Sequence, residues 1–319
     1  MGWLGTTLLV VGIVAALAGC GMAYALSRNG AAVLDAGDRL LQGDGAIRLV
    51  ATANYGTDPQ QKLEMFVPAR TTGPATGLLP VVVFIHGGGW DSGDPHDYRF
   101  VARTLAPHGY AVVLAGYRLY PKVRYPAMLE DSAAAVAWVA AHAAQYGGDP
   151  ARIVLMGHSA GAYNAVAITL ERQWLGRAGL DADALRGTIG LAGPYDFYPF
   201  DKPSAIHSFG EASDPRATQP INHVRADAPP LLLLSGDADT TVKKRNSIAL
   251  ARALTEAGAP TEAHLLAGVT HEKIVMMLAQ PFARDRRVID AVLPFLARVT
   301  APVTAPVTPA SAPVQPPGG

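Results

Sequence analysis

The sequence predicts one doubly wound α/β domain with a mostly parallel sheet of about eight strands and a small cap. Four short runs are apolar on both faces, as strands buried in a parallel sheet are: residues 81–85, 111–114, 153–156 and 231–234. Helical periodicity fills the intervals between them, and such alternation of strands and helices is typical of this fold class. Half of the 319 residues are hydrophobic, so the chain can bury a core of this size.

The remaining strands are predicted from weaker patterns within residues 28–298, the span expected to fold. Residues 46–54 and 60–67 alternate apolar and polar side chains on either side of a Gly-Thr-Asp-Pro turn, which predicts an antiparallel hairpin at the entry to the sheet. Two further candidates, residues 188–191 and 262–266, bring the expected number of strands to eight.

Helices are expected where apolar residues recur at helical spacing. The clearest stretches are residues 127–144, 163–172, 246–257 and 287–299. Residues 193–228 break the alternation, because they are rich in proline, aspartate and aromatic residues between two strands. This segment is interpreted as the short cap.

The two ends differ from the domain in composition. Residues 1–27 carry no charged side chain after the initiating methionine and are apolar enough to enter a bilayer. Within them Leu17-Ala18-Gly19-Cys20 resembles a bacterial lipobox, in which the cysteine is lipidated, and Cys20 is the only cysteine of the chain. Residues 299–319 are proline-rich, which predicts a solvated extended tail.

The N-terminal segment therefore has three readings: a lipoprotein signal, an uncleaved membrane anchor and a removed secretion signal. We expect a cell-envelope protein, membrane-anchored or lipidated, on the periplasmic or extracellular face. The membrane is then a partner through this segment. The net charge of zero and the lack of charge blocks argue against a nucleic-acid partner.

The most specific motif is Gly157-His158-Ser159-Ala160-Gly161, a G-x-S-x-G pattern between a predicted buried strand and a predicted helix. A tight strand-to-helix turn of this kind projects its serine as a nucleophile. The two glycines leave room for neighbouring backbone, and the N-terminus of the helix stabilises developing negative charge. Ser159 is therefore the candidate nucleophile.

A glycine-rich loop, His86-Gly87-Gly88-Gly89-Trp90, follows the strand at 81–85. Acyl transfer passes through a tetrahedral oxyanion, and such a loop can direct unshielded backbone N–H groups at it. We expect an oxyanion hole formed by the N–H groups of Gly87 and Gly88, completed by that of Ala160.

A serine nucleophile needs a base and an acid, which follow it in the order acid, then histidine, in this architecture. His271 lies after the 262–266 strand, and both Asp237 and Asp239 follow the 231–234 strand. Asp239 is preferred because it lies one turn beyond the strand end, with Asp237 as the alternative. None of the nine histidines has metal-ligand spacing, so neither a metal nor another cofactor is expected.

Aromatic residues of the loop and of the cap are expected to bind the substrate: Trp90, Tyr195 and Phe197. These side chains would line a small pocket. Such a pocket holds few methylene groups, which predicts a preference for short acyl chains.

At this point the chain resembles the hormone-sensitive-lipase and carboxylesterase branch of the α/β-hydrolases, over roughly residues 46–297. The similar motifs are the His86–Trp90 loop, Tyr117-Arg118-Leu119-Tyr120-Pro121, Tyr125-Pro126-Ala127 with Asp131, and Gly148-Asp149-Pro150-x-Arg152 before the elbow. Tyr120 and Lys122 depart from the usual Y-R-L-A-P-E, and the large N-terminal cap is missing, so the chain is closer to compact bacterial esterases and to the arylformamidase-like group.

The resemblance implies a serine hydrolase of short-chain acyl esters that acts through an acyl-enzyme, with small acyl esters as substrates. A formamidase or other amidase with the same triad is the alternative within enzymes. A non-catalytic, membrane-tethered binding protein is the alternative outside them, and it predicts a lost triad residue, whereas Ser159, Asp239 and His271 are all present.

Overall fold

A computed structural model describes residues 29–70 and 77–302 of the chain. The predictions for the N-terminal segment, including Cys20, and for most of the proline-rich tail lie outside these residues. Within the described ranges, no helix is both long enough and apolar enough to cross a membrane.

An eight-stranded sheet forms the centre of the molecule, in the spatial order β1-β2-β4-β3-β5-β6-β7-β8. Only β2 runs against the others, because it pairs antiparallel with both β1 and β4 whereas every other pair is parallel. The predicted mostly parallel sheet is confirmed. Its strands are β1 (Ile47–Asn54), β2 (Lys62–Pro68), β3 (Leu79–Ile85), β4 (Ala111–Ala115), β5 (Gly148–His158), β6 (Gly187–Leu191), β7 (Leu231–Gly236) and β8 (Thr261–Leu266).

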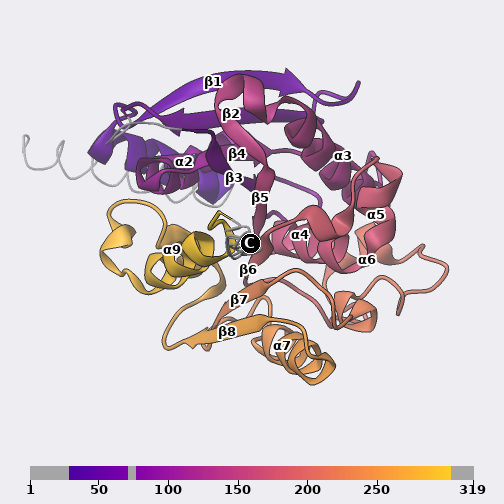
Figure 1. The fold of residues 1–319 in the computed structure, drawn as a ribbon. Coiled ribbons are helices and arrows are strands. Elements are labelled where there is room, and N and C mark those ends of the chain that lie inside the picture. Colours follow the sequence, from indigo (N-terminus) through magenta and orange to yellow (C-terminus); the bar gives the residue numbers. More distant parts are fainter. Residues whose placement is uncertain (1–28, 71–76, 303–319) are drawn as a thin grey trace, which may run out of the picture.

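Helices cover both faces of the sheet (Figure 1). One face carries α2 (Arg99–Leu105), α8 (His271–Met276) and α9 (Arg287–Val299), and the other carries α3 (Ala127–His142), α4 (Ala160–Leu170), α5 (Arg172–Arg177) and α7 (Arg245–Ala257). The remaining turns are 3-10 helices: η1 (Pro95–Tyr98), η2 (Ala106–His108), η3 (Ala143–Tyr146), η4 (Ala182–Ala184), η5 (Pro220–His223) and η6 (Phe282–Arg284).

Strand β3 shows why the apolar runs form central strands. Successive side chains of a strand point to opposite faces. Val82 and Phe84 therefore enter the core beneath α2 and α9, whereas Val81, Val83 and Ile85 enter the core beneath α3 and α4. All five are buried, and each contributes about 1.5–3 kcal/mol relative to an exposed position.

A helix over residues 29–42 precedes the sheet and was not predicted. Arg103 of α2, whose side chain is 1% exposed, holds it in place through ion pairs with Asp35, Asp38 and Asp44. Asp38 also accepts a hydrogen bond from the backbone N–H of Gln280, at 2.7 Å. Because loss of Arg103 would leave the buried carboxylate of Asp38 without a cationic partner, this network fixes the helix on the domain.

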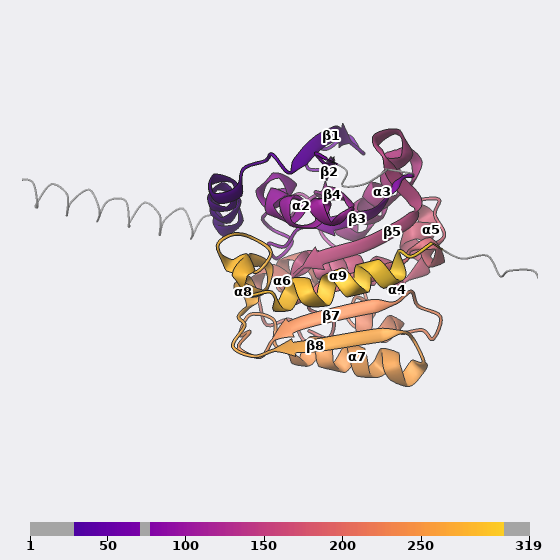
Figure 2. The ribbon, with the colours of Figure 1, turned by 60° about the vertical axis from the view of Figure 1, so that its left-hand side comes forward.

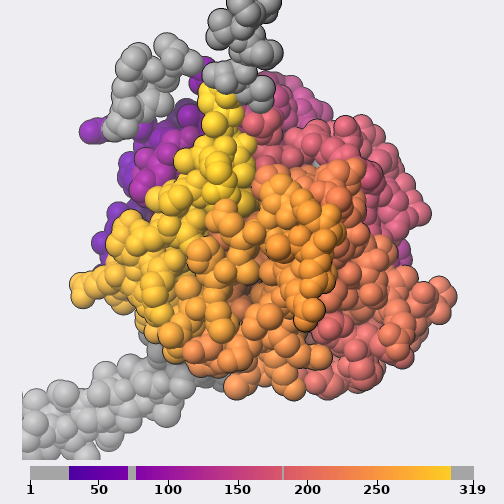
Figure 3. Space-filling model, turned by 60° about the horizontal axis from the view of Figure 1, so that its bottom comes forward, coloured from indigo at the N-terminus to yellow at the C-terminus, as the bar shows by residue number. Residues whose placement is uncertain are grey.

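The cap lies between β6 and β7, as predicted, and contains α6 (Pro203–Phe209). The C-terminal helix α9 runs along the sheet (Figure 2). The segment from β7 to α9 forms much of the face of the molecule seen in Figure 3. The predicted start of the tail at residue 299 is wrong. Val299 still belongs to α9, and the buried Thr300 donates a hydrogen bond to the Leu296 carbonyl, so the fold includes both.

Candidate active site

Ser159 lies at the sharp turn between β5 and α4, with φ 55° and ψ −121°. Residues other than glycine adopt this backbone region only at a cost, and such strain is typical of a nucleophile elbow. The turn is possible because two backbones approach closely: a Cβ on Gly161 would overlap the carbonyl oxygen of Ile85, and a Cβ on Gly157 would overlap that of Gly161. The two glycines of the motif are thus required by packing.

The structure brings Ser159, His271 and Asp239 together. In the sequence, Ser159 lies 112 residues from His271, and Asp239 lies 32 residues from it. The Ser159 hydroxyl lies 2.8 Å from Nε2 of His271, and Nδ1 of the same ring lies 2.8 Å from Oδ2 of Asp239. Since the carboxylate can only accept, Nδ1 carries the proton and Nε2 is left free to accept from the hydroxyl. This hydrogen-bonded chain has the geometry of a serine hydrolase triad.

The two candidate acids differ in burial and partners. Asp239 is 6% exposed, and its Oδ1 accepts the backbone N–H groups of Thr241 and Val242 at 2.9 and 2.8 Å. Asp237 is exposed, and its Oδ1 accepts the N–H of Gly268 at 2.6 Å. The geometry therefore places Asp239, and not Asp237, on the histidine.

The glycine-rich loop packs against the nucleophile. A Cβ on Gly87 would come within 3.3 Å of the Ser159 Cβ, so the loop backbone lies directly beside the serine. Gly88 has φ 117°, and a Cβ there would overlap the Ser92 carbonyl oxygen, so only glycine fits this position. Ala160 is the first residue of α4. Gly88 and Ala160, but not Gly87, line one cavity together with Ser159.

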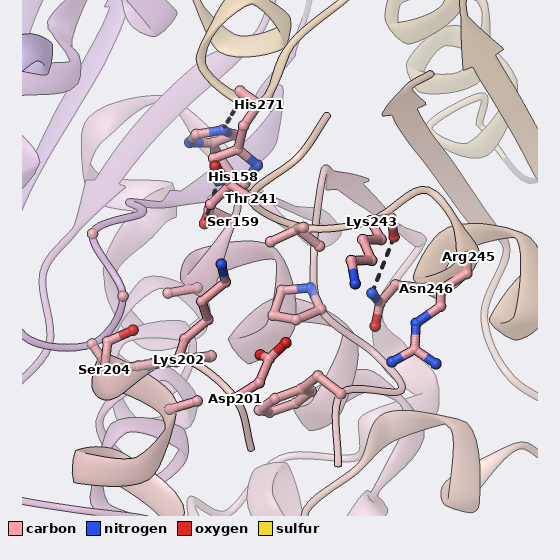
Figure 4. A pocket seen from close by; sticks show the side chains of 18 of the residues that line it. His158, Ser159, Asp201, Lys202, Ser204, Thr241, Lys243, Arg245, Asn246 and His271 are labelled. Atoms are coloured by element: carbon pink, nitrogen blue, oxygen red, sulfur yellow. Dashed lines mark hydrogen bonds between the residues drawn. The ribbon is translucent and has the colours of Figure 1, made fainter. Parts of the chain in front are cut away.

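A cavity of about 330 Å³ opens in front of the serine (Figure 4). Trp90 and Phe197 line it and stack on each other, with ring centroids 5.9 Å apart. The Trp90 Nε1–H donates to the side-chain oxygen of Asn164 at 3.1 Å, which fixes the indole. Two of the three predicted substrate-binding residues thus form its aromatic wall.

Tyr195 is the exception, because the structure does not bring it to the cavity. Its side chain is fully buried and packs with Val166 and Leu233 beneath α7. The backbone N–H groups of Tyr195 and Asp196 donate to the side-chain oxygen of Asn246, and this ties the segment to α7. The prediction that Tyr195 contacts substrate is corrected accordingly.

His158, the residue before the nucleophile, contacts the triad. Its Nε2–H donates to the backbone carbonyl of His271 at 3.0 Å, and the two rings lie 5.0 Å apart. Burial lowers the pKa of His158 to about 3, so the ring is neutral. The place of His158 before the serine in the G-x-S-x-G motif does not indicate that it hydrogen-bonds to the backbone of His271.

We predict that two buried histidines weaken the fold in acid. Burial lowers the pKa of His86 to about 4 as well. The unfolded chain takes up protons below pH about 6.5 while the folded chain does not, so stability is complete above that pH and falls below it. Between about pH 7 and pH 5 the loss is roughly 2 kcal/mol per histidine.

Urea unfolding at both pH values measures this loss. His158→Gln cannot take up the proton, so the variant should lose less stability than the native protein over the same interval. Equal losses in the two proteins would contradict the assignment to His158.

Comparison with known proteins identifies relatives of this chain and of its fold. The BD-FAE family model matches residues 63–254. A probable isoprenylcysteine alpha-carbonyl methylesterase of Oryza sativa subsp. japonica is 30% identical over 266 residues, which cover 75% of this chain and 60% of that protein. The carboxylesterase NlhH of Mycobacterium tuberculosis is 50% identical over 110 residues, 33% of this chain and 34% of that protein. The match to the methylesterase of Oryza sativa covers about three fifths of the length of that protein.

Among solved structures, esterase B from Lactobacillus rhamnosis superposes with a TM-score of 0.71 at 22% identity, covering 90% of this chain and 95% of that one. This likeness concerns the fold. In the described ranges 29–70 and 77–302, no group of three metal-binding side chains is found.

Proposed function

This chain belongs to the BD-FAE family, among the carboxylesterase-like α/β-hydrolases, and we propose that it is a serine hydrolase of carboxylic esters. The observation that carries the proposal is the hydrogen-bonded chain from Ser159 through His271 to Asp239, both links at 2.8 Å. It opens on a cavity large enough for a small ester.

The reaction follows from the roles of these groups. Ser159 Oγ attacks the ester carbonyl while Nε2 of His271 takes its proton, and the Asp239 carboxylate stabilises the imidazolium that forms. The histidine then gives the proton to the leaving alcohol, so that an acyl-enzyme remains. A water molecule repeats the sequence and releases the acid.

The negative charge of the tetrahedral intermediate is stabilised by hydrogen-bond donors that are already oriented toward it before the reaction. We assign this role to the N–H groups of Gly87, Gly88 and Ala160, because Gly87 lies beside Ser159 and the other two line the same cavity as the serine. One such donor contributes roughly 10² to 10³ in kcat.

Labelling with a fluorophosphonate tests the proposal directly. We expect stoichiometric phosphonylation of Ser159, with parallel loss of p-nitrophenyl butyrate hydrolysis. Absence of both labelling and hydrolysis would contradict it. A formyl-aromatic amide turned over faster than the ester would assign the site to the amidase alternative instead.

We predict an optimum between two and about six acyl carbons. Trp90 is held edge-on against Phe209, with ring centroids 4.7 Å apart, and stacked on Phe197, so the aromatic wall is closely packed. Each methylene that enters the cavity adds about 0.8 kcal/mol, or about fourfold in kcat/KM, until the chain outgrows the space. Measurement across p-nitrophenyl esters from acetate to palmitate checks this. An optimum at ten or more carbons would refute the short-chain assignment.

We also propose that residues 1–27 attach the enzyme to a membrane of the cell envelope, with Cys20 as the lipidated residue. Their uncharged, apolar composition supports this. The expected result is that the full chain fractionates with membranes and gains the mass of a lipid. Cys20→Ser should abolish the gain in mass, whereas an unchanged mass in the native protein would favour an unmodified anchor.

A further inference from the structure

Three cationic side chains line the same cavity as Ser159 and His271: Lys202, Lys243 and Arg245. Lys202 precedes α6 in the cap, and the other two lie at the start of α7. Figure 4 shows Lys202 extending from the cap toward Ser159, with Lys243 and Arg245 on the other side of the cavity. The cations thus line the cavity from two different elements.

None of the three forms an ion pair with a residue that the structure describes. Lysines elsewhere on the surface do find partners, since three of them face an aspartate carboxylate: Lys62, Lys122 and Lys273. Of the described residues that line the cavity, Asp201 alone is acidic, and no ion pair joins it to a neighbour. The lining thus carries three cations, Lys202, Lys243 and Arg245, against the one carboxylate of Asp201.

The carboxylate of Asp239 does not cancel this excess at the mouth. It is buried behind the His271 ring, and its oxygens already accept from the histidine and from the N–H groups of Thr241 and Val242. A concave site lined by one sign of charge raises the local concentration of ligands of the opposite sign. An arginine fork also matches the two oxygens of a carboxylate.

We propose that the preferred substrate is an ester carrying a second, ionised acid group, which Lys202, Lys243 and Arg245 bind while the ester carbonyl lies at Ser159. This inference rests on the proposed esterase activity and adds the substrate class. The aromatic wall formed by Trp90 and Phe197 then holds the uncharged part of the substrate.

Two pairs of esters test the proposal, each with an anionic and a neutral member of nearly the same shape. Para-acetoxybenzoate and para-acetoxybenzamide place the difference on the alcohol side; mono-p-nitrophenyl adipate and p-nitrophenyl adipamate place it on the acyl side. In at least one pair we expect kcat/KM of the anionic member to exceed that of its twin by about tenfold at low salt. Raising the salt from about 0.02 M to about 0.5 M should reduce this ratio.

The triple variant Lys202→Gln, Lys243→Gln, Arg245→Gln should bring the ratio close to one while the neutral esters are still hydrolysed, which also reports that the variant is folded. Lys244→Gln is the matched control, because this neighbour lies outside the cavity and should keep the ratio. Hydrolysis of the neutral esters with no anionic preference in either pair, or a preference that survives the triple variant, would overturn the inference. Failure to hydrolyse any of the four esters would instead count against the esterase activity.

Discussion

Replacing Ser159 by alanine is expected to lower kcat for p-nitrophenyl butyrate by about 10⁴- to 10⁶-fold. The change removes the atom that forms the acyl-enzyme, whereas the loop and the aromatic wall that bind substrate remain. KM should therefore change little. The Ser159–His271 hydrogen bond is lost, but alanine occupies the same turn without added bulk, so folding should be unaffected.

The measurement is steady-state kinetics on purified variants, with circular dichroism to establish folding. Ser213→Ala is a suitable control, since Ser213 is exposed in the cap. A Ser159→Ala protein that kept more than a tenth of the native activity would remove Ser159 from the mechanism.

The sheet and the order of the triad could be predicted because they depend on local patterns. Val81–Ile85 reads as a buried strand since no polar side chain interrupts it, and it is buried on both faces in the structure. The position of His271 followed from chain order alone: parallel strands end at the same edge of the sheet, so the loops after β5, β7 and β8 meet there.

Features that depend on distant partners could not be predicted. Tyr195 and Phe197 look equivalent in the sequence, yet Asn246, which lies 51 residues from Tyr195, ties the backbone so that only Phe197 reaches the cavity. In the helix over residues 29–42, Ala31 and Leu34 pack against the core whereas Leu40 and Leu41 are exposed, so its apolar pattern does not mark one buried face. The helix is held by the charge of Arg103, 65 residues from Asp38, a contact that no local pattern reveals.

The cationic side of the cavity belongs to the same group of features. Lys202 and Lys243 read as ordinary surface lysines, because lysine is mostly exposed and a single sequence does not show which ones converge. That they line one cavity becomes visible only when the cap and the start of α7 are placed around it.

The two aspartates after β7 allow the sharpest test of the acid. Asp239→Asn should lower kcat by about 10³- to 10⁴-fold, because an amide N–H facing Nδ1 of His271 favours the tautomer whose Nε2 is protonated and cannot accept from Ser159. Asp237→Asn should change kcat little, since the asparagine oxygen still accepts the Gly268 N–H and the side chain does not touch the histidine.

Both variants keep the shape of the side chain, so the contrast isolates charge and proton position from packing. If Asp237→Asn instead showed the greater loss, the orienting carboxylate would have to be Asp237, reached by a rearrangement of the loop after β7.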